Sequence, residues 1–219
     1  MSGVSERDRP VLHGFHRSSA SQRVQIALNL KGIPYELVSH DLGQDAHRSS
    51  GYLSINPQGL LPSLQYAGVI ITQSLAILDF IETQFPQPPL LPVDPLGRAR
   101  VIALFQIIAA DTHHVNSRRV GTYLKTKVGL TGDDVQAWQH HWLEESFSAF
   151  ESMLARPAPA GPFCHGDRPT LADIALIPQV ISAQRVGFRV DHHPAITRIH
   201  EHCLSQHGFS HLRESAPHA

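Results

Sequence analysis

The sequence predicts a two-part fold, a small α/β unit followed by an all-helical unit. Strand and helix patterns alternate over residues 11–85, whereas only helical spacing follows residue 95. The prolines clustered from Pro86 to Pro95 suit neither a helix nor a central strand. We therefore expect a semi-rigid linker at 87–95, between an α/β domain at 11–86 and a helical domain at 96–219.

The first unit alternates apolar runs of strand length with amphipathic runs of helix length. Gly32 and Pro34 end the first helix, and Ala67-Gly68 marks a tight turn between the last two strands. The predicted elements are a strand at 11–15, a helix at 22–31, a strand at 35–39, a helix at 45–53, strands at 63–66 and 69–72, and a helix at 74–85.

The second unit shows helical periodicity throughout. Thr170 and Asp173 match a capping box at the start of one helix. The predicted helices are 96–127, 133–154, 170–186 and a last one from about 195 to 206.

Composition argues against several partner classes. The formal charge of −1 gives no long-range attraction for nucleic acid or a membrane surface, so neither is an expected partner.

Residues 1–10 have no apolar run of a signal peptide or anchor, and we expect a disordered leader there. The two cysteines form no CxxC motif, which favours a reducing cytoplasm. The sixteen histidines lack metal-ligand spacing, so no metal is expected.

Residues 18–23 are the most informative stretch, because serines stand where a strand passes into a helix. The first turn of a helix offers unpaired N–H groups and the positive end of the helix dipole, which favour an anion. The hydroxyls of Ser18, Ser19 and Ser21 add donors for a thiolate or a carboxylate, and Arg17 and Arg23 add positive charge. A serine loop that only caps the helix is the alternative.

A second strand passes directly into a helix at Gln73-Ser74. The first turn of this helix should favour an anion for the same reason. Upstream, Leu61-Pro62 opens an interior strand, where proline is tolerated only if its missing N–H is not needed. A cis peptide bond there would aim the Leu61 backbone outward.

Taken in order, these motifs make the chain resemble the glutathione transferase superfamily and, within it, the zeta class. The resemblance implies a thioredoxin-like domain that binds glutathione, a helical domain that supplies most of the second-substrate pocket, and a homodimer. The residues that carry it are the zeta-like signature at 17–28, Asn56-Pro57, Leu61-Pro62, Gln73-Ser74, the segment 111–119, and the segments 170–173 and 178–180.

The resemblance also implies roles for single residues. Ser18 or Ser19 would hydrogen-bond the glutathione sulfur and be catalytic, and the Leu61 backbone would pair with the cysteinyl backbone. The other implied glutathione contacts are His47, Gln73 and Ser74.

His113 shares an apolar-spaced helical face and is a further candidate contact with glutathione or substrate. A buried neutral histidine satisfied by a backbone carbonyl is the alternative for this residue.

The implied activity is the glutathione-dependent cis–trans isomerisation of maleylpyruvate or maleylacetoacetate. A thiolate can add to a double bond conjugated to a carbonyl, and rotation followed by loss of the sulfur returns the trans isomer. The zeta signature often has Cys at the position of Ala20. Its absence argues against reductive dehalogenation by a protein cysteine but leaves the isomerisation possible, because glutathione supplies the nucleophile.

The implied substrate is a dianionic keto acid, so its pocket should be basic. The candidate residues are Arg17, Asn116, Arg118, Arg119 and Arg185. The pair Arg118-Arg119 looks more like the maleylpyruvate isomerases. A solvated surface charge is the alternative for each arginine.

Two other functions remain open. A broad conjugating glutathione transferase would keep the glutathione contacts but need an apolar second site. A non-catalytic glutathione-binding scaffold would keep the fold and the ligand without turnover.

Overall fold

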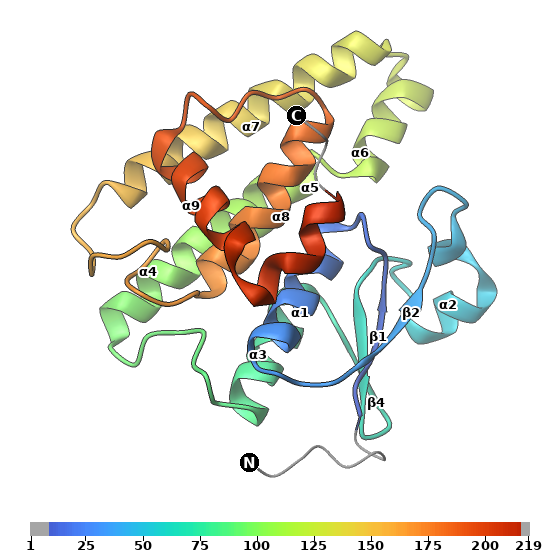
Figure 1. Ribbon diagram of the computed structural model, residues 1–219. Coiled ribbons are helices and arrows are strands. Elements are labelled where there is room, and N and C mark those ends of the chain that lie inside the picture. Colours follow the sequence, from blue (N-terminus) through green and yellow to red (C-terminus); the bar gives the residue numbers. More distant parts are fainter. Residues whose placement is uncertain (1–8, 216–219) are drawn as a thin grey trace. The chain divides into compact units, whose positions relative to one another are not determined.

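The structure is a computed structural model that describes residues 9–215. This part of the chain divides into two compact units, residues 9–90 with 207–215, and residues 91–206 (Figure 1). Of the expected disordered leader at 1–10, residues 1–8 lie outside the described residues. Arg9 and Pro10 are ordered, since Arg9 donates to the Tyr35 carbonyl and the Pro10 carbonyl accepts from the Glu36 N–H.

The first unit is built on a four-stranded mixed sheet of order β2-β1-β3-β4. β1 pairs with β2 in parallel and with β3 antiparallel, and β3 pairs antiparallel with β4. Its elements are β1 (Val11–Gly14), α1 (Ser19–Leu30), β2 (Glu36–Ser39), η2 (Ala46–Arg48), α2 (Ser50–Ile55), β3 (Ser63–Tyr66), β4 (Val69–Thr72), α3 (Ser74–Gln84) and η5 (His207–Ser215).

Apolar side chains from the sheet and from α1 and α3 form the core of this unit. Leu12 and Leu64 from the sheet pack with Val24 and Leu28 of α1 and Ile77 of α3. The alternation of strands and helices that the sequence predicts is confirmed. The largest shift in the bounds is the start of the first helix, which lies at Ser19 rather than at residue 22. The second helix begins as the short 3₁₀ turn η2 and continues as α2.

The directions of the strands place three features at one edge of the sheet, namely the starts of α1 and α3 and the Leu61-Pro62 segment. β1 and β4 both run antiparallel to β3, so they point the same way, and α1 and α3 begin at the edge where these strands end. β3 starts at that edge, because Ser63 pairs with both His13 and Thr72. The first turns of both helices and Leu61-Pro62 therefore share one edge.

The C-terminal segment η5, which follows the helices of the second unit in the sequence, packs with the first unit. Phe209 and Leu212 are fully buried, and the Asn29 amide lies 3.2 Å from the His211 ring nitrogen. Phe209 and Leu212 share one face and pack beside α1, a long-range contact that helical periodicity cannot reveal.

The boundary between the two units follows Leu90 and falls within the proline-rich linker expected at 87–95. The Lys31 ammonium donates to the carbonyls of Phe85 and Pro88 and pairs with Glu82 at 2.7 Å. Glu82 also accepts from the Leu90 N–H at 2.9 Å. These contacts fasten the first half of the linker to the α/β unit.

The second unit is all-helical in its described residues, as the sequence predicts. α8 is buried along most of its length, and Thr170 and Asp173 form the predicted capping box at its start. Its elements are α4 (Pro95–Gln106), η3 (Ile107–Thr112), α5 (His113–Val115), α6 (Arg118–Tyr123), η4 (Leu124–Val128), α7 (Gly132–Leu154), α8 (Leu171–Arg185) and α9 (Pro194–Ser205).

The single helix predicted at 96–127 is instead divided into several pieces. The Thr112 hydroxyl donates to the carbonyl of Ile107, five residues earlier, within the π-helical turn η3. Asn116 and Ser117 donate from their side chains to the carbonyls of Thr112 and His114, and α5 ends there. Side-chain donors that bond nearby carbonyls compete with the helical pattern, which explains the break.

Over residues 9–215, none of the helices combines the length and the apolar character that crossing a bilayer requires.

Candidate active site

The first turn of α1 is the first of the two anion sites that the sequence predicts. Ser18 is the N-cap of α1, and its Oγ accepts from the Ser21 N–H at 3.3 Å. The Ser21 hydroxyl oxygen in turn accepts from the Phe15 N–H. Ser18 therefore does cap α1, as the alternative interpretation expects. Capping uses a lone pair of the Ser18 oxygen, so the hydroxyl proton can still be donated to an anion.

The first turn of α3 is the second site, and the structure connects it to α1. The Arg23 side chain is 1% exposed, and its Nη1 lies 3.4 Å from the Ser74 hydroxyl oxygen. Burial lowers the pKa of Arg23 to about 10, so the guanidinium remains charged at neutral pH. A buried cation thus lies behind the start of α3.

Gln73, just before α3, has a left-handed backbone with φ of 71°. This region is uncommon for residues other than glycine, and such geometry clusters at functional sites. The Gln73 amide donates to the Gln58 side-chain carbonyl at 2.7 Å. Gln58, which the sequence analysis did not single out, therefore helps to orient the Gln73 side chain.

The peptide bond between Leu61 and Pro62 is cis. Gly59 has φ of +58°, and a Cβ there would lie 3.1 Å from the His47 carbonyl oxygen and 3.1 Å from the Arg48 side chain. The turn η2, which carries the half-buried His47, therefore lies against this segment.

These groups fit the chemistry of glutathione, which carries two carboxylates, a thiol and a peptide backbone. The two helix N-termini offer donors and positive potential for anions, and Arg23 adds a permanent charge behind one of them. The Leu61 backbone lies at the same edge of the sheet.

Apart from Arg17, the remaining predicted contacts lie in the helical unit, where one short segment carries four of them. His113 and Asn116 are half-buried, whereas Arg118 and Arg119 are exposed at the start of α6. The Asn116 side-chain amide donates to the Thr112 carbonyl at 3.0 Å. Its carbonyl oxygen Oδ1 is buried and accepts from no donor in residues 9–215.

α7 fastens this segment and the end of α8. Trp138 donates its indole N–H to the Val115 carbonyl at 3.0 Å. Gln136 and His140 bond the Val186 carbonyl, just after Arg185. Arg185 and residues 116–119 are therefore both tied to one short stretch of α7, whereas Arg17 is exposed before α1 in the other unit.

Sequence reasoning missed Gln58 and Trp138, and it did not foresee the contact of Arg23 with Ser74. Gln58 gave no signal, because an exposed polar loop residue is unremarkable. Trp138 gave a weak signal, since a partly buried indole N–H usually finds an acceptor.

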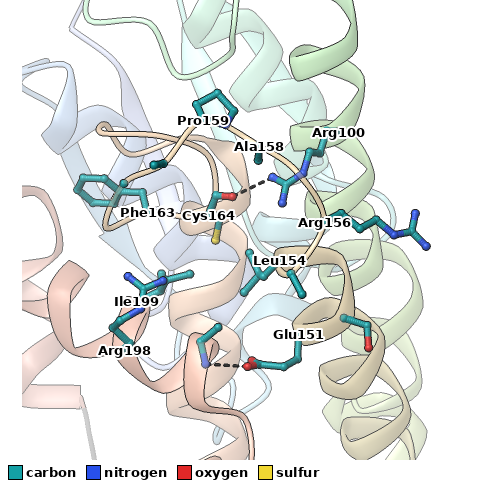
Figure 2. A pocket seen from close by; sticks show the side chains of 15 residues that line it. Arg100, Glu151, Leu154, Arg156, Ala158, Pro159, Phe163, Cys164, Arg198 and Ile199 are labelled. Atoms are coloured by element: carbon teal, nitrogen blue, oxygen red, sulfur yellow. Dashed lines mark hydrogen bonds between the residues drawn. The ribbon is translucent and has the colours of Figure 1, made fainter.

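A hollow of about 490 Å³ opens in the helical unit, and no predicted site residue lines it. Figure 2 shows the Arg100 guanidinium directed at the Cys164 carbonyl and the Glu151 carboxylate directed at a backbone N–H. Arg100 also bonds the Met153 carbonyl, and Glu151 accepts from two N–H groups in the first turn of α9. Both side chains are engaged in tying backbone segments together.

Among residues 9–215, no group of three or more histidine, cysteine or acidic side chains is arranged to hold a metal ion. The His13–His40 pair bonds directly, ring nitrogen to ring nitrogen, at 3.0 Å.

Both halves of the chain match known domain families. Residues 12–89 match the glutathione S-transferase N-terminal domain, and residues 136–214 match the glutathione S-transferase C-terminal domain. The chain belongs to the glutathione S-transferase family.

Two curated relatives of this glutathione S-transferase are isomerases by name. A maleylpyruvate isomerase from Ralstonia sp. is 40% identical, over 94% of this chain and 96% of its own length. A maleylacetoacetate isomerase from Rhizobium meliloti (strain 1021) is 42% identical, over 91% of this chain and 93% of its own length.

Solved structures agree with these relatives. A holo maleylpyruvate isomerase, described as a bacterial zeta-class glutathione S-transferase, superposes with a TM-score of 0.90 at 40% identity, covering 94% of this chain and 96% of its own. A maleylacetoacetate isomerase from Methylobacterium extorquens AM1 with bound malonate and glutathione gives a TM-score of 0.90 at 37% identity, covering 95% and 100%. The resemblance to the zeta class is confirmed.

Proposed function

We propose that this protein is a glutathione-dependent cis–trans isomerase of a maleyl keto acid. The observation that carries the proposal is the donor set at one edge of the sheet, where the first turns of α1 and α3 and the Leu61 backbone meet. The names of the relatives, and the malonate and glutathione in one related structure, support the same activity.

The α/β unit would hold glutathione through these groups. Ser74, backed by Arg23, and Gln73 would bind the γ-glutamyl end, and the Leu61 backbone would pair with the cysteinyl part. His47 would contact the tripeptide from η2.

The chemistry supplied by bound glutathione is reversible addition of its thiolate to the maleyl double bond, which allows rotation and returns the trans isomer with no net redox change. The Ser18 hydroxyl, with Ser19 beside it, would donate to the sulfur. The dipole of α1 would favour its negative charge, so the two effects together would lower the pKa of the thiol.

The chain's own thiols are unsuited to this role. Cys164 and Cys203 are buried in the helical unit, and burial raises the pKa of each thiol. A protonated thiol is a poor nucleophile, and Ala20 offers no thiol at the start of α1. The nucleophile must therefore come from glutathione.

The substrate carboxylates would be held by basic groups of the helical unit. Arg118 and Arg119 stand at the start of α6, where the helix dipole adds positive potential, and Asn116 presents a polar side chain just before them. Arg17, His113 and Arg185 are further candidate contacts. The paired arginines favour maleylpyruvate, the shorter of the two acids.

We further propose a homodimer in a reducing cytoplasm. Val69 on β4 and Leu96 on α4 are exposed apolar side chains of the kind that an interface covers. Both cysteines are free thiols, which fits a reducing compartment. Light scattering of the purified protein would test the dimer.

The activity is tested with maleylpyruvate and maleylacetoacetate, each with and without glutathione, by following loss of the conjugated maleyl absorbance. We expect glutathione-dependent turnover of both acids, with the larger kcat/KM for maleylpyruvate. An uncharged aryl halide is the comparison substrate. Conjugation of the halide without turnover of either acid would favour a conjugating transferase, and tight glutathione binding without turnover of any substrate would indicate a binding module.

A further inference from the structure

The Tyr52 hydroxyl forms hydrogen bonds at both ends of the segment that contains Leu61 and Pro62. Tyr52, on α2, is 1% exposed, and its hydroxyl oxygen lies 2.7 Å from the Leu60 carbonyl oxygen and 2.9 Å from the Ser63 hydroxyl oxygen. Leu60 and Ser63 are the residues on either side of Leu61-Pro62. A single side-chain atom therefore bridges the segment.

The direction of these two hydrogen bonds follows from the donors available. A carbonyl only accepts, so the single proton of the Tyr52 hydroxyl goes to Leu60. The Ser63 hydroxyl must then donate to the Tyr52 oxygen. Donors in such a chain polarise one another and strengthen each bond. The Leu60 carbonyl accepts a second bond from the Asn56 amide at 2.8 Å.

The ring of Tyr52 is itself fixed by two histidines. The ring centroid of His40 lies 4.5 Å from that of Tyr52, and the ring of His13 lies 6.1 Å away. His13 and His40 are joined at 3.0 Å between ring nitrogens. Tyr52 is thus packed on its ring and bonded at its hydroxyl, which leaves it little freedom to move.

From this geometry we propose that Tyr52 is a positioning residue for glutathione, which sets the Leu61 backbone in place to pair with the cysteinyl part of the tripeptide. The inference rests on the proposed function. Tyr52 acts on the tripeptide through Leu60, Leu61 and Ser63. Without its hydroxyl the Leu61 segment would have to be ordered at the moment of binding, and that ordering weakens affinity.

The test is Tyr52→Phe, which removes one oxygen and keeps the ring, with glutathione affinity measured by calorimetry. We expect the dissociation constant to rise about tenfold, the size expected for losing one to two hydrogen bonds. At saturating glutathione, kcat should change little. Tyr66→Phe is the matched control, because Tyr66 lies on β3 with its ring against Phe80 and Phe85, and its affinity should equal that of the wild type.

A glutathione analogue with an ester in place of the cysteinyl amide tests whether Tyr52 acts through the contact between the Leu61 backbone and the cysteinyl part. The analogue cannot donate from that position, so the wild type should bind it about tenfold more weakly than glutathione. In Tyr52→Phe this difference should shrink to about twofold, because both changes act on one contact. Ser63→Ala, which removes only the donor to Tyr52, should weaken glutathione binding by a smaller factor than Tyr52→Phe.

The outcomes separate the two proposals. Failure of the wild type to bind glutathione would overturn the proposed function. Wild-type binding with equal affinity in Tyr52→Phe, or an undiminished difference between glutathione and the ester, would overturn the role of Tyr52 alone. If Tyr52→Phe does not fold, the Ser63→Ala measurement decides by the same comparison.

Discussion

At the scale of the residue, Ser18 has a structural role and a proposed chemical role. Its hydroxyl oxygen caps α1 by accepting from the Ser21 N–H, and its proton can still be donated. Ser18→Ala would change both the stability of the fold and the contact with the sulfur, because loss of an N-cap costs about 1 kcal/mol of stability. Glycine at the same position costs only a few tenths of that amount.

Ser18→Gly is therefore the informative variant. We expect the free energy of unfolding to change little, while the pKa of the bound glutathione thiol rises by about one unit and kcat/KM at neutral pH falls about tenfold. The thiolate absorbance of the bound cofactor, titrated against pH, measures the shift. Ser19→Ala is the comparison variant, and a thiol pKa raised only in Ser19→Ala would assign the sulfur contact to Ser19 instead.

Residue-level prediction of the site rests on local rules. Ser18 and Ser74 are candidates because serine at a strand-to-helix junction has a physical meaning, and Leu61 because it precedes a proline that opens a strand. The contact of Arg23 with Ser74 and the bridge from Tyr52 to Leu60 and Ser63 depend on tertiary packing. No periodicity or spacing in the chain encodes those contacts.

At the scale of the element, the broken helical region at 107–123 differs most from the sequence prediction. π-turns inside helices are rare and frequently occur at functional sites. Here η3 lies before the segment proposed to bind substrate, and Trp138 of α7 fixes that segment through the Val115 carbonyl. Hydrophobic spacing could predict the helical character of the region but not the breaks, which arise from the side-chain donors of Thr112, Asn116 and Ser117.

Trp138→Phe tests this connection. Loss of the indole N–H leaves the Val115 carbonyl without that donor and loosens residues 116–119, so kcat/KM for the keto acid should fall about fivefold. Glutathione affinity should stay within about twofold of the wild type. Steady-state kinetics with each substrate varied in turn separate the two effects.

Trp142→Phe is the matched control on the same helix. The Trp142 indole nitrogen is buried without a hydrogen-bond partner within residues 9–215, so its loss removes no bond to the substrate segment. Equal losses of kcat/KM in both variants would argue that packing of the two rings, rather than the bond to Val115, supports the site.

At the scale of the whole molecule, stability should depend on pH through buried histidines. Burial lowers the pKa of His200 to about 4, and also lowers the pKa of His13 and His40. An unfolded histidine has a pKa near 6.5, so below that value the unfolded chain binds more protons than the folded one. The stability that these neutral histidines contribute is fully present above pH 6.5. It is lost as the pH falls from 6.5 towards 4.

His200 alone should contribute about 2 kcal/mol to the loss of stability between pH 7 and pH 5. Urea unfolding at the two pH values should show a clearly smaller loss in His200→Gln than in the wild type. His207→Gln, at an exposed position, is the control variant. An identical pH dependence in His200→Gln and the wild type would contradict the assigned role of His200.

The two-unit organisation itself was accessible from the sequence, because the change from alternating strands and helices to helices alone is a strong signal. The return of η5 to the α/β unit was not, since Phe209 and Leu212 find their partners far away in the chain. Contacts of that kind require the folded structure.

The central claim, that glutathione acts as a catalyst and is regenerated, is tested most directly by counting thiols. The purified protein is given maleylpyruvate in large excess over glutathione, and free thiol and fumarylpyruvate are measured at the start and at completion. The account predicts many moles of product per mole of glutathione, with the thiol concentration unchanged. Loss of one thiol for each substrate consumed would contradict it and indicate conjugation instead.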